Sequence, residues 1–311
     1  MQGQPAPPAS STPASDSSAA GASERPPEPP RGAPSEDPKP EAARWLPEGS
    51  FRDQVCVVTG GGTGLGLQIS RGLAALGATV VIGSRNAEHH RELRTEADRH
   101  GWSVEALTLD VREPKELRAA ADGIVKRHGK IDVLVNNAAG NFVCPAERLS
   151  QNAWRSVLGI VLDGTFYCSQ AFGKKMIAAE QGSILNIVAT YAWTGMAGVV
   201  HSASAKAGVL AMTKTLAAEW ARFAIRVNAI APGPFVSEGA QQNLFPDEAT
   251  QERITRGIPR GRWGTAEEIA AHCLWLLSPA SDWVTGECLT VDGGASMPTR
   301  FWEPGERLRR R

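Results

Sequence analysis

The feature that most constrains this chain is a glycine-rich turn between an apolar run and a helical pattern. Val55–Thr59 is nearly all apolar, the turn Thr59-Gly60-Gly61-Gly62-Thr63-Gly64-Leu65-Gly66 follows it, and the helical pattern Leu65–Leu76 begins inside the turn. Glycines let a backbone approach a pyrophosphate closely, and free N–H groups at a helix start favour negative charge. The order of strand, glycine turn and helix therefore predicts a dinucleotide-binding unit; a simple tight turn is the alternative interpretation.

Short apolar runs alternate with helical patterns along the rest of the chain. After the first strand, the runs that we interpret as strands are Thr79–Gly83, Val104–Leu109, Asp132–Val135, Ser183–Ile187, Val227–Ile230 and Cys288–Val291. The helical patterns are Leu65–Leu76, Glu88–Arg99, Pro114–His128, a long one around Trp154–Ala179, Ser202–Arg222 and Glu267–Leu277. This alternation indicates right-handed βαβ units and a parallel sheet. We therefore expect a Rossmann-type, doubly wound α/β fold in a single domain.

The composition divides the chain into three parts. Residues 1–44 are rich in Pro, Ala, Ser and Gly and contain no Ile, Leu, Val, Phe, Trp or Tyr. Such a segment buries too little apolar surface to offset the entropy of ordering, so we expect a disordered tail. The catalytic domain is expected over residues 45–300, and residues 301–311 form a short basic tail. Within the domain, residues 235–262 break the alternation of strands and helices, which predicts a lid over a ligand.

Charge and cysteine content exclude several classes of protein. The 33 basic and 33 acidic residues balance, which argues against binding to nucleic acid or an anionic membrane through bulk charge. No apolar run reaches the ~18 residues of a membrane span. The five cysteines show neither metal-ligand nor redox-motif spacing, so we expect no metal site and a reducing, cytoplasmic location.

The ends of the second and third strands predict which dinucleotide is bound. NAD-binding proteins usually carry Asp or Glu at the end of the second strand, whereas this chain has Ser84-Arg85. A hydroxyl and a guanidinium suit a 2′-phosphate, so the pair predicts NADPH; an exposed arginine after a strand is the alternative. Asp110-Val111 ends the third strand, where a carboxylate can reach an adenine amino group.

Polar residues follow the fourth strand in the run Asn136-Asn137-Ala138-Ala139-Gly140-Asn141-Phe142. The small residues let the backbone lie close to a cofactor, and Asn141 would then face the mouth of the site. A turn asparagine that satisfies its own backbone is the alternative for Asn141.

A lysine and a tyrosine are candidates for catalysis. Lys206 lies early on the helical pattern Ser202–Arg222, between two alanines, where it can bind ribose hydroxyls and lower the pKa of a nearby tyrosine. Of the two tyrosines, Tyr167 lies within an apolar helical pattern and Tyr191 lies just beyond the fifth strand. Tyr191 is therefore the candidate, with a packed loop aromatic as the alternative.

Together these residues resemble the short-chain dehydrogenase/reductase family over about residues 51–296. The motifs in family order are Thr59–Gly66, Asn136–Gly140, Lys206, Pro232-Gly233 and Asp292-Gly293-Gly294. The resemblance implies a seven-stranded sheet, a nicotinamide cofactor and a homotetramer. The cofactor-binding residues that it implies are Gly60, Gly62, Thr63, Gly64, Leu65, Gly66, Ser84, Arg85, Asp110, Val111, Asn137, Lys206, Pro232, Gly233, Pro234 and Phe235.

Three positions depart from the ordinary family pattern. Ser202 stands where most members have the tyrosine four residues before the lysine. Ala189 replaces a serine, and Val161 stands where an asparagine is usual. A carbonyl reductase needs a proton donor beside the substrate oxygen, so the usual geometry has been abandoned.

One branch of the family, the NADPH-dependent 2,4-dienoyl-CoA reductases, abandons it in the same way. The runs that resemble this branch are Gly60–Gly66, Asn137–Phe142, Ala203–Gly208 and Ala231–Pro234, and Tyr191 lies fifteen residues before Lys206, as the active tyrosine does there. The resemblance implies Tyr191, Lys206, Asn141 and Ser202 as catalytic residues. It implies that Arg112, Phe142 and Ser150 contact the acyl-CoA, a substrate of unsaturated fatty acid β-oxidation that is reduced through a dienolate.

One departure from this branch concerns the predicted lid. The branch usually has a basic residue there, whereas the chain reads Gln241-Gln242-Asn243. Two other functions stay open at this stage. One is a general NADPH-dependent carbonyl or 3-oxoacyl thioester reductase, and the other is a non-catalytic NADPH-binding scaffold whose proline-rich tail binds a partner.

Overall fold

The structure, a computed structural model, describes residues 39–236 and 247–297 of the 311. These residues belong to one compact unit that begins at Lys39. The predicted basic tail at 301–311 and most of the predicted disordered tail at 1–44 lie outside the described residues.

The centre of the domain is a seven-stranded sheet in the order β3-β2-β1-β4-β5-β6-β9, and every pair of neighbours is parallel. Its strands are β1 Val55–Thr59, β2 Thr79–Ser84, β3 Val104–Thr108, β4 Val133–Asn136, β5 Gly182–Ile187, β6 Ile225–Pro232 and β9 Cys288–Val291. Each strand overlaps an apolar run singled out in the sequence, so the predicted doubly wound α/β fold is confirmed.

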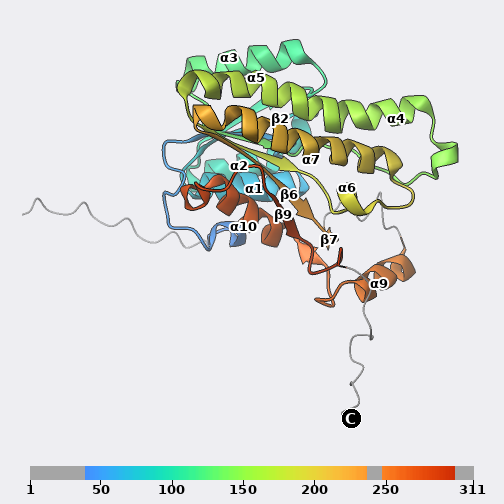
Figure 1. Cartoon of the computed structure of the whole chain (residues 1–311). Helices are drawn as coiled ribbons and strands as arrows, with labels where there is room; N and C mark the ends of the chain where they lie inside the picture. Colours follow the sequence, from blue (N-terminus) through green and yellow to red (C-terminus); the bar gives the residue numbers. More distant parts are fainter. Residues whose placement is uncertain (1–38, 237–246, 298–311) are drawn as a thin grey trace, which may run out of the picture. The chain divides into compact units, whose positions relative to one another are not determined.

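Helices cover both faces of the sheet. Figure 1 shows α3, α5 and α7 on one face and α1, α2 and α10 on the other. Their bounds are α1 Gly64–Ala75, α2 Arg91–His100, α3 Pro114–His128, α5 Gly164–Ala179, α7 Val200–Trp220 and α10 Ala266–Leu277. Each face has its own apolar core: Leu73, Ile69 and Leu274 are fully buried on the α1/α10 face, and Phe172 and Leu117 on the α3/α5 face.

The order of the strands fixes where a ligand can bind. β1 pairs with β2 on one side and with β4 on the other, so the chain reverses direction across the sheet between β1 and β4. At such a reversal the loops after neighbouring strands diverge and leave a crevice outside the carboxyl ends. The loops that follow Thr59 of β1 and Asn136 of β4 therefore flank the expected binding crevice.

The long helix predicted around Trp154–Ala179 is divided into three segments. α4 spans Gln151–Leu158, a π-helical turn spans Gly159–Asp163, and α5 continues from Gly164. The helix begins earlier than expected because the Ser150 hydroxyl oxygen accepts a hydrogen bond from the Ala153 amide at 3.2 Å and caps the first turn. A π-helical turn changes backbone pairing without changing the apolar pattern, so the sequence does not reveal it.

Ordered structure begins earlier than the sequence indicates. A short 3₁₀ helix, η1 Glu41–Ala43, packs against α1 and α10, and its residues Ala42 and Ala43 are buried. The boundary expected at Trp45 is therefore too late by at least four residues. The boundary was predicted from the first large apolar side chains, whereas η1 packs through the methyl groups of Ala42 and Ala43.

The region predicted to form a lid has structure of its own at both ends. β7 Phe235–Val236 pairs in parallel with β8 Gly264–Thr265, and α9 spans Glu248–Gly257. The run Gln241-Gln242-Asn243, where a basic residue was missing, lies outside the described residues. A short helix, α6 Tyr191–Thr194, follows β5 and was not predicted.

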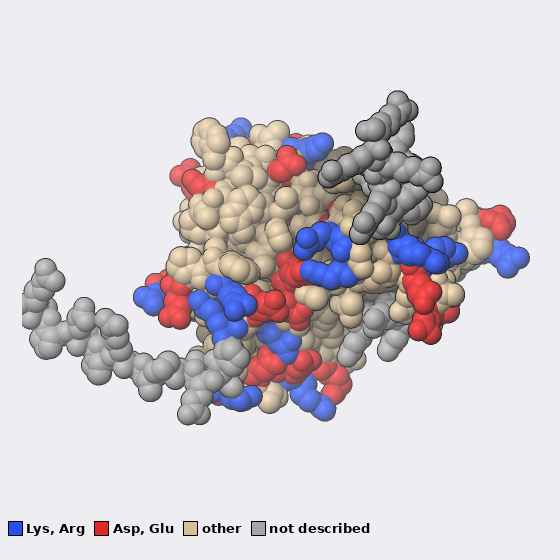
Figure 2. All heavy atoms as spheres, turned by 90° about the horizontal axis from the view of Figure 1, so that it is seen from below, with Lys and Arg blue, Asp and Glu red and all other residues tan. Residues whose placement is uncertain are grey.

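The surface charge and the hydropathy of the helices can be described for the same residues. Figure 2 shows acidic and basic side chains interspersed on the face that it views. No helix within residues 39–236 and 247–297 is both long and apolar enough to cross a bilayer. The same residues contain no cluster of three or more His, Cys, Asp or Glu arranged to hold a metal ion.

Candidate functional site

At Gly62 and Gly66 the glycine turn after β1 is packed so closely that a side chain cannot replace a hydrogen. A Cβ on Gly66 would lie 2.1 Å from the Gly60 carbonyl oxygen, and a Cβ on Gly62 would lie 1.9 Å from the His89 carbonyl oxygen. Real Cβ atoms do not approach backbone so closely. The glycines thus let the start of α1, the strand end and the segment after β2 meet around one concave surface, the form that a bound pyrophosphate requires.

Two side chains lock this turn to the loop after β4. The Thr59 hydroxyl accepts hydrogen bonds from the backbone amides of Asn137 and Ala138, both at 3.0 Å. In return, the Asn137 side-chain amide donates to the carbonyls of Thr59 at 3.0 Å and of Gly60 at 3.1 Å. Asn137, predicted as a cofactor ligand, lines the cavity described next, and its amide nitrogen holds the loop on which a cofactor would rest.

A cavity of about 470 Å³ opens above these loops at the carboxyl ends of β1, β2 and β3. Seven of the sixteen predicted cofactor residues line this cavity. The lining residues are Gly60, Thr63, Gly83, Ser84, Arg85, Asn86, His89, Leu109, Asp110, Val111, Asn137, Ala138, Ala139 and Ile160. Glycines form its floor and an exposed arginine lies at its rim, so the cavity fits a dinucleotide diphosphate and an adenosine ribose.

Some polar side chains at the rim of this cavity already have partners within the protein, and one is exposed. The Ser84 hydroxyl donates to the Asn86 carbonyl at 2.8 Å, while Arg85 is exposed. Asp110 forms a bidentate pair with Arg112, whose guanidinium lies as close as 2.6 Å, and this pair lowers the pKa of the Asp110 carboxyl. Arg112, predicted to contact the acyl-CoA, is thus tied to the carboxylate predicted to reach adenine.

Three of the predicted catalytic side chains meet beyond β5. The Tyr191 hydroxyl lies 3.1 Å from the Ser202 hydroxyl, and the Asn141 side-chain amide donates to the Tyr191 oxygen at 3.5 Å. Tyr191 is the first residue of α6, Ser202 lies in the first turn of α7, and Asn141 comes from the loop after β4. The sequence places them 50 and 11 residues from Tyr191, and the fold brings them together.

The backbone fixes which end of the Asn141 amide faces the tyrosine. Its oxygen accepts the Phe142 backbone N–H at 2.9 Å, so its NH₂ group points toward Tyr191. The Phe142 ring packs edge-on against His201, with centroids 4.5 Å apart, and His201 is fully buried. The turn role weighed for Asn141 and the role of a donor therefore occur together, one on each end of the side chain.

Lys206 lies one helical turn beyond Ser202 and is buried, with 7% of its surface exposed. Its ammonium donates to the Ile187 carbonyl at 2.5 Å, at the end of β5. Burial lowers the pKa of Lys206 to about 8 because the charged form loses its hydration. The lysine is thus held at the carboxyl edge of the sheet, on the same side as Tyr191 and Asn141.

The structure does not show the expected lowering of the pKa of Tyr191 by Lys206. Burial raises the pKa of the Tyr191 hydroxyl, while hydrogen bonds with Ser202 and Asn141 oppose the rise. The charge of Lys206 is not among the causes. The idea that the lysine lowers the pKa of this tyrosine was therefore wrong for the chain by itself; the hydroxyl stays protonated and available as a donor at neutral pH.

Two of the three positions that depart from the family pattern, Ala189 and Val161, are apolar and enclosed. Ala189 is 9% exposed, and Val161 in the π-helical turn is 1% exposed. Neither side chain can donate a hydrogen bond to a substrate oxygen. That role is therefore left to the donors on Tyr191 and Asn141 at this end of the crevice. Ser150, predicted to touch the acyl-CoA, uses its hydroxyl oxygen to cap α4.

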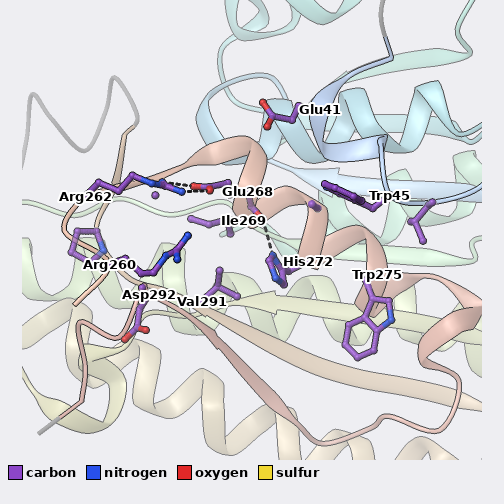
Figure 3. A pocket seen from close by; sticks show the side chains of 15 residues that line it. Glu41, Trp45, Arg260, Arg262, Glu268, Ile269, His272, Trp275, Val291 and Asp292 are labelled. Carbon is purple, nitrogen blue, oxygen red and sulfur yellow. Dashed lines mark hydrogen bonds and ion pairs between the residues drawn. The ribbon is translucent and has the colours of Figure 1, made fainter. Parts of the chain in front are cut away.

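A second cavity of about 620 Å³ lies away from these residues, between η1, α10 and the end of β9 (Figure 3). Of the predicted site residues only Pro234 lines it. Its Arg262 and Glu268 form an ion pair at 2.5 Å, and the His272 ring contacts the Glu268 carbonyl at 2.7 Å. Because Arg262 and Glu268 are already paired and its lining includes no catalytic candidate, this cavity is the weaker candidate, although it is larger than the first.

Sequence reasoning missed several lining residues of the first cavity, His89 among them, and it missed the role of Thr59. His89 lines the cavity and lies four residues after Arg85. Its closeness in sequence to the end of β2 could have identified it as a candidate. Thr59 was quoted only as part of the glycine motif, whereas its hydroxyl joins two loops. Pro232 ends β6, Gly233 and Pro234 follow it, and Phe235 begins β7; none of the four lines the first cavity.

Comparison with known proteins agrees with this arrangement. The family model described as enoyl-(acyl carrier protein) reductase matches residues 60–296. A Bacillus subtilis protein named probable 2,4-dienoyl-CoA reductase [(2E)-enoyl-CoA-producing] is 46% identical over 240 residues, which are 76% of this chain and 94% of the relative. A Danio rerio protein named peroxisomal 2,4-dienoyl-CoA reductase [(3E)-enoyl-CoA-producing] is 41% identical over 244 residues, 78% of this chain and 81% of the relative.

Solved structures show the same fold. A crystal structure of a short chain dehydrogenase from Bacillus anthracis is 45% identical with a TM-score of 0.73, and the match covers 80% of this chain and 98% of that one. A gluconate 5-dehydrogenase from Burkholderia cenocepacia, solved in complex with NADP and tartrate, is 34% identical with a TM-score of 0.76 over 83% of this chain and 99% of that one.

Proposed function

The chain belongs to the short-chain dehydrogenase/reductase family and is an oxidoreductase, and from this we propose that it reduces 2,4-dienoyl-CoA thioesters with NADPH. The relatives that carry this activity in their names match more than three quarters of the chain. Their names differ in the position of the product double bond, so the proposal covers the substrate and not that position.

The observation that carries the proposal is the meeting of Asn141, Tyr191 and Ser202. Two hydrogen-bond donors, the Asn141 amide and the Tyr191 hydroxyl, lie 3.5 Å apart. At that separation both can reach a single oxygen placed about 2.7–3.1 Å from each, which is the geometry of an oxyanion site. A thioester carbonyl oxygen in this position would accept from both groups.

The two donors act where charge develops. When bound, the reduced nicotinamide supplies a hydride to the far carbon of the diene, and the electrons of the conjugated path move to the thioester oxygen. Asn141 and Tyr191 stabilise the resulting dienolate by hydrogen bonds that are stronger to an anion than to a neutral carbonyl. Collapse of the dienolate takes a proton at carbon, from the Tyr191 hydroxyl or from a water that it positions, and the tyrosine recovers its proton from solvent.

Lys206 and Ser202 have supporting roles in this scheme. Lys206, fixed at the Ile187 carbonyl, is placed to hold the hydroxyls of the nicotinamide ribose. Ser202 shares a hydrogen bond with the Tyr191 oxygen and so restrains the direction of its O–H group. Because the oxygen is polarised and not protonated as a ketone would be, the family's usual tyrosine position can carry a serine.

NADPH is proposed over NADH for two reasons. Arg85 lies at the cavity rim, and β2 has no carboxylate at its end that could bind the ribose hydroxyls. The 2′-phosphate would meet the guanidinium, the glycine turn would hold the diphosphate, and Asp110 lies at the end of β3 for the adenine. The homotetramer and the cytoplasmic location stay predictions.

The test is NADPH oxidation by the purified full chain with 2,4-hexadienoyl-CoA, run beside acetoacetyl-CoA. We expect turnover of the dienoyl thioester at a kcat/KM at least about tenfold above that of the 3-oxoacyl thioester. Preference for acetoacetyl-CoA would support a general 3-oxoacyl reductase, and NADPH binding without turnover of either thioester would support the scaffold function.

A further inference from the structure

A buried histidine beside the candidate site has no role in the chemistry described so far. His201 lies in the first turn of α7 and is fully buried, and neither of its ring nitrogens has a hydrogen-bond partner among the described residues. A buried polar group without a partner costs free energy, because it has lost its bonds to water and gained none in the protein. Such a group needs an explanation other than stability, and functional sites are where it is expected.

The contact that this imidazole does make is with Phe142. The two rings meet edge to face, with their centroids 4.5 Å apart and their planes at 76°, an arrangement that aromatic pairs favour. Phe142 is half-buried, so His201 supports its ring from the inside of the protein while part of the Phe142 side chain stays exposed. The buried histidine thus determines where this ring can lie.

Phe142 is in turn bonded to one of the two candidate donors. Its backbone N–H donates to the side-chain oxygen of Asn141 at 2.9 Å, which directs the NH₂ group of that side chain toward Tyr191. A displacement of Phe142 would therefore turn or shift the Asn141 amide. The position of the donor depends on the position of the ring, and the ring depends on His201.

The loop that carries Asn141 is anchored on both sides of this contact. Before it, the Asn137 side chain bonds to two carbonyls of the glycine turn. After it, the Cys144 backbone N–H donates to the Gly198 carbonyl at 2.8 Å, just ahead of α7. Both anchors act on backbone several residues from the Asn141 amide or beyond the Phe142 ring, so the pairing of the two rings is the support nearest to the donor.

His201 also adjoins the second donor's partner. It directly precedes Ser202, whose hydroxyl lies 3.1 Å from the Tyr191 hydroxyl. The same turn of α7 therefore carries the contact that restrains Tyr191 and the ring that supports the loop of Asn141. A single rigid element can in this way fix the distance between the two donors.

We propose that His201 is a positioning residue of the oxyanion site: its ring, packed against Phe142, sets the orientation of the Asn141 amide relative to the Tyr191 hydroxyl. The inference deepens the proposed function and rests on it, because it takes these two groups as the donors to the thioester oxygen. Donors of this kind must be held within about 0.5 Å by packed neighbours, and a misplacement of about 1 Å can lower a rate by about 10²-fold.

The experiment is a double-mutant cycle on kcat/KM with NADPH and 2,4-hexadienoyl-CoA. His201→Leu removes the ring at similar volume, and Asn141→Ala removes the amide. We expect His201→Leu to lower kcat/KM by about ten- to hundredfold in the otherwise unmodified chain and by less than about twofold in the Asn141→Ala background, where no amide is left to orient. A merely structural role would give the same factor in both backgrounds.

Two further measurements separate positioning from stability. NADPH affinity should be unchanged in His201→Leu, because the ring does not line the cofactor cavity. The melting temperature should fall by no more than about 2 °C, since the lost ring contact is offset by the removal of two unpartnered nitrogens. Ser183→Ala is the matched control: it removes another buried and unpartnered polar group, near the start of β5, and it should leave kcat/KM unchanged in both backgrounds.

A second variant tests the same contact from the loop side. Phe142→Leu removes the other ring of the pair on a half-buried side chain, so it remains informative if His201→Leu does not fold. It should lower kcat by a factor that again nearly disappears in the Asn141→Ala background. A loss of kcat that is the same in both backgrounds would contradict the inference.

Crystal structures of the unmodified protein and of His201→Leu give a readout that does not depend on turnover. The separation of the Asn141 amide nitrogen and the Tyr191 oxygen, 3.5 Å in the unmodified chain, should increase in the variant. If the unmodified protein does not reduce the dienoyl thioester, the proposed function fails, and the two structures still decide whether His201 orients the amide. If it does reduce the thioester, but His201→Leu has no effect, the same effect in both backgrounds or an unmoved Asn141 amide, only the inference about His201 is overturned.

Discussion

The hydroxyl of Tyr191 lies 3.1 Å from the hydroxyl of Ser202, the residue that occupies the family's usual tyrosine position. The phenol is therefore on α6 and not on α7, and its oxygen lies within hydrogen-bond distance of the side chain that occupies the usual position. A relocated oxygen approaches a substrate from a different element and beside a different partner, the Asn141 amide. This relationship explains how a site can lose its usual tyrosine and keep an acidic hydroxyl.

Removing that hydroxyl gives the first test. Tyr191→Phe should lower turnover of a dienoyl thioester by about 10²-fold or more, because a donor to the developing oxyanion is lost. NADPH affinity and melting temperature should change little, since the ring is kept. Steady-state kinetics with a cofactor titration checks both. Tyr167→Phe, which alters the other tyrosine on α5, is the matched control and should leave turnover unchanged; equal losses in the two variants would remove Tyr191 from the mechanism.

The second prediction concerns the partner donor. Asn141→Ala should also reduce turnover, and the double variant with Tyr191→Phe should lose less than the product of the two single losses, because both donors serve one oxygen. Ser202→Ala should have a milder effect, since it only restrains the Tyr191 hydroxyl. A double-mutant cycle on kcat/KM measures this coupling. Full multiplicativity would mean that the two groups contact different atoms.

The features of the fold that could be predicted from the sequence are those that a local pattern of residue types determines. β1 at Val55–Thr59 and α3 at Pro114–His128 have the bounds expected from apolar periodicity. In α3, a proline in the first turn and Gly129 just beyond the end, at a φ of 82°, mark both ends in the sequence. Fold class followed because such signals repeat along the chain.

The partners of individual polar side chains could not be predicted. Nothing in the sequence shows that Asp110 is taken up by Arg112, or that Asn137 uses its amide on two loop carbonyls. These contacts depend on distances of a few ångströms that the pattern of residue types does not specify. The buried alanines of η1 were missed for a related reason, since a small side chain gives a weak apolar signal and packs only because α1 and α10 leave room.

Cofactor preference is tested by reversing the charge at the end of β2. Arg85→Asp should weaken NADPH binding by about 10- to 100-fold, because a charge-assisted hydrogen bond is replaced by repulsion from the 2′-phosphate. NADH binding should change far less. Fluorescence titration of both cofactors measures this difference, with Arg118→Asp on exposed α3 as the control. Equal affinity of the unmodified protein for NADPH and NADH would contradict the assignment.

The N-terminal boundary is tested by two truncations that differ by six residues. Removal of residues 1–38 should leave turnover and melting temperature nearly unchanged, because the segment lacks apolar anchors. Removal of residues 1–44 should lower the melting temperature by at least about 2 °C, because the buried Ala42 and Ala43 leave α1 and α10 uncovered. Scanning fluorimetry of both proteins provides the comparison. Identical melting temperatures would show that η1 contributes nothing to stability, and a loss in the shorter truncation would show that residues 1–38 do contribute.

The last prediction uses the buried lysine. The pKa of Lys206 falls from a usual value near 10.5 to about 8 in the folded chain. Between these values the unfolded state binds more protons than the folded state, so stability rises with pH through this window and the penalty of burying the charge is present in full below it. The penalty corresponds to about 3 kcal/mol.

Lys206→Met removes the ionisable group, so the variant should be the more stable protein at pH 7, and the difference should shrink toward pH 10. Urea unfolding at both pH values measures it, with Lys175→Met, whose ammonium pairs with Asp122 at the surface, as a control with no comparable trend. A stability difference that is independent of pH would mean that folding does not lower the pKa of Lys206, so that the lysine binds its proton equally in the folded and unfolded states.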